Sequence, residues 1–149
     1  ELKAAAVAER LAADGALAGA MVIGADQVAH VDGEILHKPY TVDNQRRQLV
    51  KLRGRQHALT TGVCLIDGAG RRSFCETSII HFRIDLSDQE LEDYLATGEG
   101  RECCGGYQVE GLGAQLIERI EGDWFNVVGL PVLGVITAMR QRGWRPWTA

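Results

Sequence analysis

The sequence predicts an α/β protein with a mixed, partly antiparallel sheet flanked by helices. Three observations lead to this prediction: strand-like apolar runs follow one another along the chain, short turn sequences join them into hairpins, and segments with helical spacing alternate with them. Because 46% of the 149 residues are hydrophobic, the chain can bury one core. We therefore expect residues 1–149 to form one domain.

The first elements are a helix, a strand and a hairpin. Residues 1–13 carry Leu and Ala at helical spacing. The apolar run AMVIGAD, residues 20–26, is typical of a buried strand, with Asp26 at its end. The runs VAHV and EIL then flank Asp32-Gly33, a dipeptide that suits the positive backbone angles of a two-residue hairpin turn.

The later elements follow from capping residues, turn residues and strand alternation. They are a helix over residues 42–53 capped by Thr41, strands over residues 57–67 and 71–85 joined by the turn Gly68-Ala69-Gly70, a short helix opened by the capping box Ser87-Asp88-Gln89-Glu90 and running through Tyr94, a strand over residues 116–122, and a last helix over residues 131–143. Helices and strands thus alternate around a sheet that contains hairpins.

Charge and apolar patterning exclude some classes of protein. The formal net charge is -4, and Lys and Arg are spread along the chain, so general nucleic-acid binding is not expected. No run approaches the ~18 apolar residues of a membrane span, and we expect no secretion leader. We expect a cytoplasmic protein without a membrane segment.

The cysteines and histidines show no metal-ligand spacing. The four cysteines are Cys64, Cys75, Cys103 and Cys104, and none belongs to a Cys-x-x-Cys pair, so reduced thiols are expected. Cys64 and Cys75 lie in apolar strand-like runs, where free cysteine behaves as a small hydrophobe. The four histidines, His30, His37, His57 and His81, are scattered and are interpreted as structural or exposed.

Asp26 and Lys38 are the first candidate site residues. A carboxylate at the end of a buried strand lies where α/β sheets usually bind ligands. An Asp at that position is more often a turn former or a helix cap, and a Lys before a proline is usually a solvated charge. Position alone therefore leaves both interpretations open.

A glycine-rich segment and a helix entrance are the other candidates. The segment from Gly98 to Gly113 lets backbone amides approach a ligand closely, but a flexible loop explains its composition as well. Within it, Glu110 is a carboxylate among apolar and glycine neighbours, and Tyr107 is a candidate for stacking on a base. Residues 126–131, entering the last helix, offer amides to a phosphate, although core packing explains them better.

Taken together, several motifs resemble the Maf family of nucleotide pyrophosphatases. They are GADQV followed by DGEILHKP, TGV at residues 61–63, HFR at residues 81–83, Tyr94, GYQVEGLGAQLIERIEG and VVGLP. The family's spacing between Asp and Lys is kept between Asp26 and Lys38. The resemblance covers nearly the whole chain and is specific, because several motifs agree in order.

The chain departs from the family at its start. The N-terminal signature, a strand followed by Ser-x-Ser-Pro-Arg-Arg that handles the triphosphate, is absent. The sequence also opens at Glu1 without Met, and no capping residue precedes the first helix. We expect the natural protein to begin earlier, and we expect this chain without that segment to hydrolyse nucleotides poorly.

The glycine-rich segment indicates a branch of the family. The commonest family form, Lys-Ala-Gly-Ala-Tyr followed by Gln, is here Cys103-Cys104-Gly105-Gly106-Tyr107 followed by Glu110. With Gln27 after Asp26, this combination is similar to the 7-methyl-GTP branch and unlike the dTTP/UTP branch. The resemblance therefore implies hydrolysis of 7-methyl-GTP.

The resemblance also implies roles for five residues. Hydrolysis between the α and β phosphates would use a divalent cation, Mg²⁺ or Mn²⁺, and Asp26 would take the proton of the attacking water or hold the metal. Lys38 and Lys3 would pair with phosphate oxygens. Glu110 would accept from the two adjacent donors of a guanine-type base, while Gln27 donates to the neighbouring carbonyl. The family resemblance further implies a homodimer.

Other functions stay open. The chain is alternatively a dTTP/UTP pyrophosphatase of the same family, or a nucleotide-binding regulator of cell division and septum formation without significant turnover. A nucleotide-independent interaction domain would leave Asp26, Lys38 and Glu110 without a common pocket. A shared cleft among these three residues is therefore the expectation that separates an enzyme or nucleotide-binding protein from a plain interaction domain.

Overall fold

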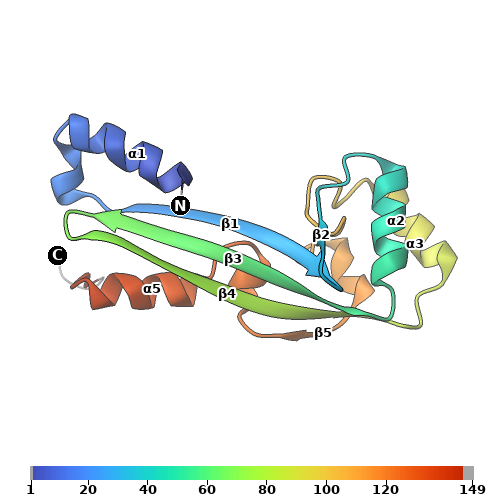
Figure 1. Cartoon of the computed structure of the whole chain (residues 1–149). Coiled ribbons are helices and arrows are strands. Elements are labelled where there is room, and N and C mark those ends of the chain that lie inside the picture. The colour runs from blue at the N-terminus through green and yellow to red at the C-terminus, as the bar shows by residue number, and fades with distance from the viewer. Residues whose placement is uncertain (1, 146–149) are drawn as a thin grey trace.

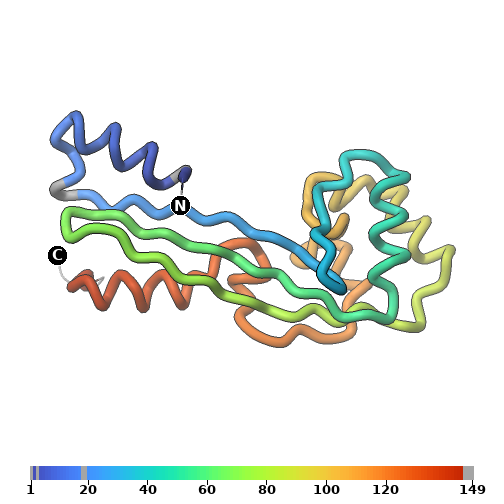
Figure 2. Tube along the Cα trace, viewed as in Figure 1, coloured from blue at the N-terminus to red at the C-terminus, as the bar shows by residue number. Residues whose placement is uncertain are grey.

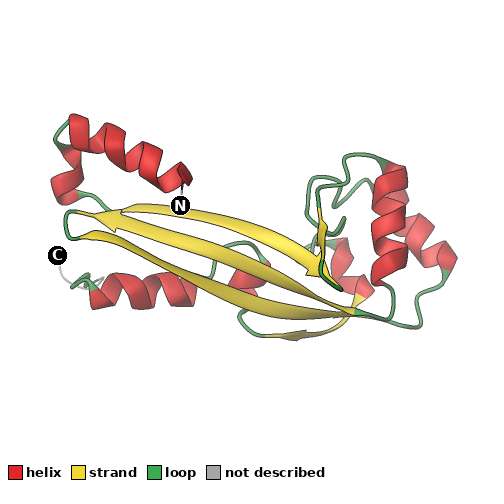
Figure 3. Cartoon of the chain, in the orientation of Figure 1, coloured by secondary structure: helices red, strands yellow, loops and turns green. Residues whose placement is uncertain are grey.

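Long antiparallel strands form the centre of the molecule, with helices grouped at both ends (Figures 1 and 3). The computed structural model describes residues 2–145, apart from side-chain detail at positions 3, 18 and 19. Its elements are, in chain order, α1 (Leu2–Ala13), η1 (Ala16–Gly19), β1 (Val22–Val31), β2 (Glu34–Leu36), α2 (Val42–Leu52), β3 (Gln56–Asp67), β4 (Gly70–Phe82), α3 (Asp88–Thr97), η2 (Leu112–Leu116), β5 (Ile117–Glu121), α4 (Trp124–Val127) and α5 (Val132–Gln141). The predicted α/β class is confirmed.

The five strands form one sheet in the order β2-β1-β3-β4-β5. Every strand pairing within residues 2–145 is antiparallel, whereas the sequence predicted a mixed, partly antiparallel sheet. The predicted hairpin turn between β1 and β2 is confirmed: Val31 pairs with Glu34, and the turn residues Asp32 and Gly33 have φ angles of 50° and 80°. Hairpins therefore connect β1 to β2 and β3 to β4, and they fix the register of the long strands.

The predicted helix caps are confirmed. The Thr41 side chain accepts a hydrogen bond from the backbone N–H of Asn44 at the start of α2. Ser87 and Glu90 form the complete capping box at the start of α3. This helix runs to Thr97, three residues past the predicted end, and stops at Gly98, whose φ of 77° suits a glycine after a helix.

Two helices cover opposite faces of one end of the sheet (Figure 1). On one face, Ala4 and Ala8 of α1 pack on Val22 and Cys64. On the other face, α5 packs on β3, and Val135 joins a small core there. Figure 2 shows α1 running back along the first part of β1.

Close approach of α1 to the sheet depends on Gly24. A Cβ atom built at this position would lie 2.7 Å from the Cβ of Ala4, closer than such atoms approach in proteins. The glycine therefore lets the helix rest directly on the strand. None of the helices in residues 2–145 combines the length and the apolar character that a membrane span requires.

The largest core lies at the other end of the sheet, beneath α2 and α3. Its buried members are Ala29, Val31, Leu36, Leu49, Leu52, Leu59, Ile80, Phe82, Leu86, Leu91, Tyr94, Leu95, Tyr107, Val109, Leu116 and Val127. Side chains of the glycine-rich segment and of α4 belong to this core. The same packing that stabilises this end of the molecule therefore also shapes the cavity beside it.

Candidate active site

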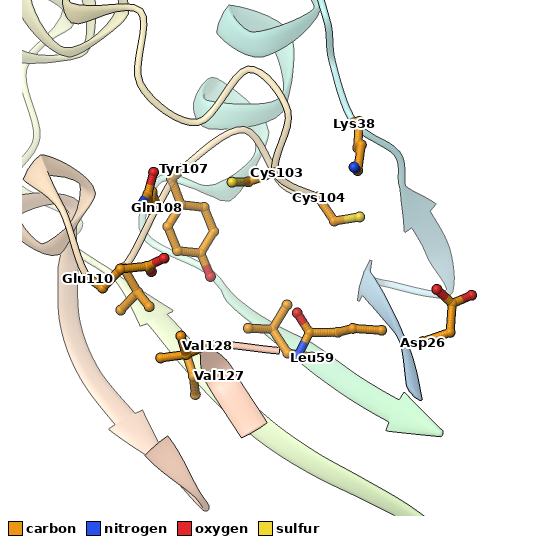
Figure 4. A pocket seen from close by; sticks show the side chains of 12 residues that line it. Asp26, Lys38, Leu59, Cys103, Cys104, Tyr107, Gln108, Glu110, Val127 and Val128 are labelled. Atoms are coloured by element: carbon orange, nitrogen blue, oxygen red, sulfur yellow. The ribbon is translucent and has the colours of Figure 1, made fainter. Parts of the chain in front are cut away.

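One cavity of about 270 Å³ brings together segments that are far apart in the sequence (Figure 4). It is lined by Asp26, Gln27, Lys38, Leu59, Cys103, Cys104, Tyr107, Gln108, Val109, Glu110, Val127 and Val128. The expectation that Asp26, Lys38 and Glu110 share a cleft is confirmed. The side chain of Lys3 lies outside the described part of the chain.

Asp26 lies in the middle of β1, where it pairs with Gly62 of β3. The prediction that it ends a buried strand was wrong, because β1 continues to Val31. A strand needs apolar residues only where a face is covered, so a polar residue on its open face does not end it. Asp26 is exposed and directed to one edge of the cavity (Figure 4).

Gln27 points away from Asp26, since neighbouring strand residues face opposite sides of a sheet. Its Nε2 donates to Thr61 Oγ1 at 3.0 Å and to the backbone carbonyl of Asn126 at 2.6 Å. Both N–H groups of the amide are thus taken up by the protein. Gln27 thus ties α4 to the sheet and shapes the cavity wall, and its donation to a base carbonyl stays a prediction.

Lys38 follows β2 in a loop whose backbone is held by neighbouring residues. The carbonyl of His37 accepts a hydrogen bond from Gln48 Nε2 at 2.8 Å, and the carbonyl of Pro39 accepts one from Asn44 Nδ2 at 3.0 Å. The N–H of Tyr40 donates to the carbonyl of Arg101 at 3.0 Å. The backbone on both sides of Lys38 is therefore fixed, although its side chain is exposed.

Tyr107 is a core residue. Its side chain is 5% exposed, its hydroxyl lies 2.8 Å from His57 Nε2, and its ring packs edge-on against Phe82 with ring centroids 5.0 Å apart. Burial raises the pKa of the phenol. The prediction that Tyr107 stacks on a base is corrected, because its ring is already packed by residues of distant strands. The apolar wall of the cavity comes instead from Leu59, Val109, Val127 and Val128.

His57 makes protein stability depend on pH. It is 2% exposed, and burial, together with the charges of His30 and His81, lowers its pKa to about 4. The unfolded chain binds a proton near the ordinary pKa of ~6.5, whereas the folded protein does not. Folded stability is therefore fully present above pH ~6.5 and is expected to fall by about 3 kcal/mol as the pH approaches 4.

Urea unfolding between pH 7.5 and 4.5 measures this dependence. The matched variant is His57→Asn, which cannot titrate in this range. Its own stability is expected to be lower at every pH, but with a shallower slope against pH below 6.5. Equal slopes in the two proteins would contradict the assignment of a buried neutral His57.

The cysteines differ in exposure. Cys64 is buried in the core under α1, as expected, whereas Cys75 is exposed because its stretch of β4 has no covering helix on that face. Cys103 and Cys104 are half-buried and line the cavity. Burial raises the pKa of the Cys103 thiol, with the Glu110 charge adding to the effect, so its neutral form is favoured.

The entrance to the last helix has a structural role. Asn126 is fully buried, and its Nδ2 donates to the carbonyl of Leu59 and to Ser78 Oγ, both at 3.0 Å. These bonds hold α4 against the sheet and present Val127 and Val128 to the cavity. Core packing thus explains this segment, as the sequence favoured.

The carboxylates that line the cavity suit a divalent cation that enters the site bound to the phosphates of a ligand. Within residues 2–145, no three His, Cys, Asp or Glu side chains gather closely enough to hold a metal ion by themselves. A Mg²⁺ ion bound to phosphates keeps several waters and needs only one or two protein carboxylates. Asp26, the carboxylate on the Lys38 side of the cavity, fits that requirement (Figure 4).

Three proteins with similar sequences share the name dTTP/UTP pyrophosphatase. The chain is 39% identical to the dTTP/UTP pyrophosphatase of Dictyoglomus thermophilum over 128 residues, which cover 84% of this chain and 65% of that protein. It is 42% identical to the dTTP/UTP pyrophosphatase of Pyrococcus furiosus over 115 residues, which cover 77% and 60%. The match to the dTTP/UTP pyrophosphatase of Thermus thermophilus is 40% over 131 residues, or 88% and 70%.

The chain thus spans between 60% and 70% of the length of these relatives. Their shared name does not support the 7-methyl-GTP branch that Cys103, Cys104 and Glu110 suggested. The sequence model described as Maf-like protein matches residues 1–142. With this match over nearly its whole length and identities of 39% to 42%, the chain belongs to the Maf family.

Proposed function

We propose that this protein hydrolyses a nucleoside triphosphate to the monophosphate and pyrophosphate, and that its preferred substrates are dTTP and UTP. The observation that carries the proposal is the meeting of Asp26, Lys38 and Glu110, from three distant segments, around one cavity. The names of the relatives support the same reaction and the pyrimidine substrates.

The two ends of the cavity differ in chemistry (Figure 4). Lys38 and Asp26 lie at one end, and Gln108 and Glu110 at the other, with Leu59, Val127 and Val128 between them. A nucleotide that places its phosphates near the lysine would place its base near Glu110. The apolar residues between them suit the faces of a base.

At the phosphate end, Lys38 supplies a positive charge to the phosphate oxygens. Asp26 accepts a proton from the attacking water or holds the cation that accompanies the phosphates. A bound Mg²⁺ or Mn²⁺ would neutralise phosphate charge and lower the pKa of a coordinated water. The leaving group is pyrophosphate, so the charge near Lys38 grows as the bond between the α and β phosphates breaks.

At the base end, two observations favour a pyrimidine. The cavity of about 270 Å³ is slightly smaller than most small-molecule sites, which run from ~300 to ~1,000 Å³. Both N–H groups of the Gln27 amide donate to Thr61 and Asn126, so neither is directed to a guanine carbonyl in this structure. Glu110 can still accept from the single imide N–H of uracil or thymine, with Gln108 as donor to a carbonyl.

The variant Glu110→Gln is expected to change activity differently for a uracil base and for a guanine base. For uracil, the amide oxygen accepts from the imide N–H and the amide nitrogen donates to the adjacent carbonyl, so activity on UTP is expected to persist. For a guanine base, the amide puts a donor against a donor, which costs ~1–3 kcal/mol. The ratio of kcat/KM for UTP to that for 7-methyl-GTP is therefore expected to rise by about tenfold or more.

Pyrophosphate release with UTP, dTTP, GTP and 7-methyl-GTP measures this ratio on the protein as its gene encodes it. The matched control is Glu102→Gln, an exposed carboxylate of the same loop that does not line the cavity. A ratio unchanged by Glu110→Gln would show that Glu110 does not read the base. A wild type that prefers 7-methyl-GTP would reject the pyrimidine assignment, and nucleotide binding without release of pyrophosphate would favour the regulator.

The cytoplasmic location and the homodimer that the sequence suggested stay predictions.

A further inference from the structure

We propose that Glu99 and Gln45 are positioning residues that set base selectivity by holding the glycine-rich segment, residues 98–113, in the conformation that presents Gln108 and Glu110. Neither residue lines the cavity, so each would act only through that segment. The inference rests on the proposed function and extends it. Sequence patterns pointed to neither residue as part of a site.

Glu99 binds the far end of the segment with its carboxylate. Its Oε1 accepts hydrogen bonds from the N–H of Gly113 at 2.8 Å and from the hydroxyl of Tyr94 at 3.1 Å. Its Oε2 accepts one from the N–H of Leu112 at 3.0 Å. One side chain thus fixes the backbone two and three residues after Glu110.

Tyr94 extends this network to the other side of Glu110. Its hydroxyl donates to Glu99 and accepts a hydrogen bond from the backbone N–H of Gln108 at 3.2 Å. The backbone is therefore bonded both before and after Glu110, and both bonds lead to the Glu99 carboxylate. A change at Glu99 would be felt at both residues that we assign to the base.

Gly111 explains how the carboxylate reaches this position. A Cβ atom at residue 111 would lie 2.4 Å from Glu99 Oε2, so any side chain there would displace the carboxylate from this position. The carboxylate consequently packs against the backbone of the residue that follows Glu110. The backbone that follows Glu110 is thus held by close packing as well as by hydrogen bonds.

Gln45 holds the start and the middle of the same segment. It is fully buried on α2, and its Nε2 donates to the carbonyl of Glu99 at 2.5 Å and to the carbonyl of Gly106 at 2.7 Å. Gln45 therefore holds the backbone of Glu99, while the side chain of Glu99 holds the backbone of Leu112 and Gly113. Between them they bind the segment at residues 99, 106, 112 and 113.

The charge of Glu99 strengthens this arrangement. Burial opposes ionisation, but hydrogen bonds from Leu112, Gly113 and Tyr94 outweigh it and hold the pKa of Glu99 below its ordinary value. The side chain is thus an ionised acceptor near neutral pH. Three donors converge on an anion that has no donor of its own, a pairing that an amide cannot reproduce.

Glu99→Gln tests the inference. Its amide group places a donor where backbone N–H groups converge, so the segment is expected to shift. KM for UTP should rise by about tenfold while kcat changes by less than about threefold, because the groups at the phosphate end are untouched. The ratio of kcat/KM for UTP to that for 7-methyl-GTP should fall by a similar factor.

Two further variants complete the comparison. Tyr94→Phe removes only the hydroxyl and is expected to raise KM in the same direction by about threefold. Ser87→Ala removes the cap of α3 without touching the segment, so it should lower Tm while leaving KM and the substrate ratio unchanged. If Glu99→Gln and Tyr94→Phe behave like Ser87→Ala, their role is structural and the inference is wrong.

The outcomes also separate this inference from the proposed function. If wild-type protein releases no pyrophosphate, the proposed function fails, and the comparison is made on the Kd of UMP by calorimetry. A Kd weakened by Glu99→Gln and Tyr94→Phe but not by Ser87→Ala sustains the positioning role. Equal Kd values in all four proteins, or no binding of UMP to wild type, overturn it.

Discussion

Replacing Asp26 by Asn is expected to reduce kcat for UTP by about 100- to 10,000-fold, the range that proton transfer by a positioned side chain contributes. The amide keeps the shape of the carboxylate, but it accepts no proton from water, and as a neutral group it binds a cation more weakly. Asp26 is exposed on a long strand, so the fold should persist. Nucleotide affinity, measured as Kd, should change little, because the base and Lys38 are unaffected.

The control for this variant is Glu118→Gln, which removes a negative charge from an exposed position on β5, away from the cavity. Its kcat should equal that of wild type. Steady-state rates of pyrophosphate release and Kd from equilibrium binding are needed for all three proteins. An Asp26→Asn variant that retains wild-type kcat would reject Asp26 both as base and as metal ligand.

Lys38→Gln is expected to lower kcat/KM for UTP by roughly 10- to 100-fold. A hydrogen bond to a charged group contributes ~1.5–3 kcal/mol, and the amide cannot supply the positive charge. Because the proposed contact is with phosphate, the affinity for uridine should stay within about twofold of wild type. Rising salt should weaken UTP binding to wild type more than to the variant.

Lys51→Gln is the matched control, since Lys51 forms an ion pair with Glu34 and does not line the cavity. Calorimetry with UTP and with uridine distinguishes the two ends of the nucleotide. Equal weakening of both ligands by Lys38→Gln would place Lys38 against the nucleoside. No change in either would remove it from the binding site.

Local chemistry predicted most of the fold. The Asp32-Gly33 turn, the Thr41 cap and the Ser87 capping box depend on residues that are close in sequence. The local sequence was therefore enough to predict them. The position of Asp26 was misjudged because the end of a strand depends on its neighbours. Pairing with β3 continues through Gln27 to His30, regardless of the polar side chains on the open face.

The site was predictable only in part. Local spacing cannot bring Asp26, Lys38 and Glu110 together, and the family resemblance supplied that expectation. The stacking role of Tyr107 was wrong, and the protein partners of Gln27 were not foreseen, because Thr61, Asn126 and His57 come from distant segments. Whether a polar side chain bonds to a ligand or to another part of the protein is seen only in the folded structure.

Gln45 and Glu99 were overlooked for a related reason. A glutamine on a helix and a glutamate after a glycine carry no special pattern. A weak signal existed for Gln45, which occupies the same helix face as Leu49 and Leu52, where an apolar residue is expected. A polar residue on an apolar helix face needs a buried partner, and here the partners are two carbonyls of the glycine-rich segment.

Product analysis with UTP and dTTP tests the proposed reaction most directly. The protein, expressed as its gene encodes it and supplied with Mg²⁺, is incubated with each nucleotide, and the products are separated by ion-exchange chromatography. We expect monophosphate and pyrophosphate in equal amounts, with no diphosphate formed. Diphosphate with inorganic phosphate, or no turnover of any nucleoside triphosphate, would contradict a pyrophosphatase that cuts between the α and β phosphates.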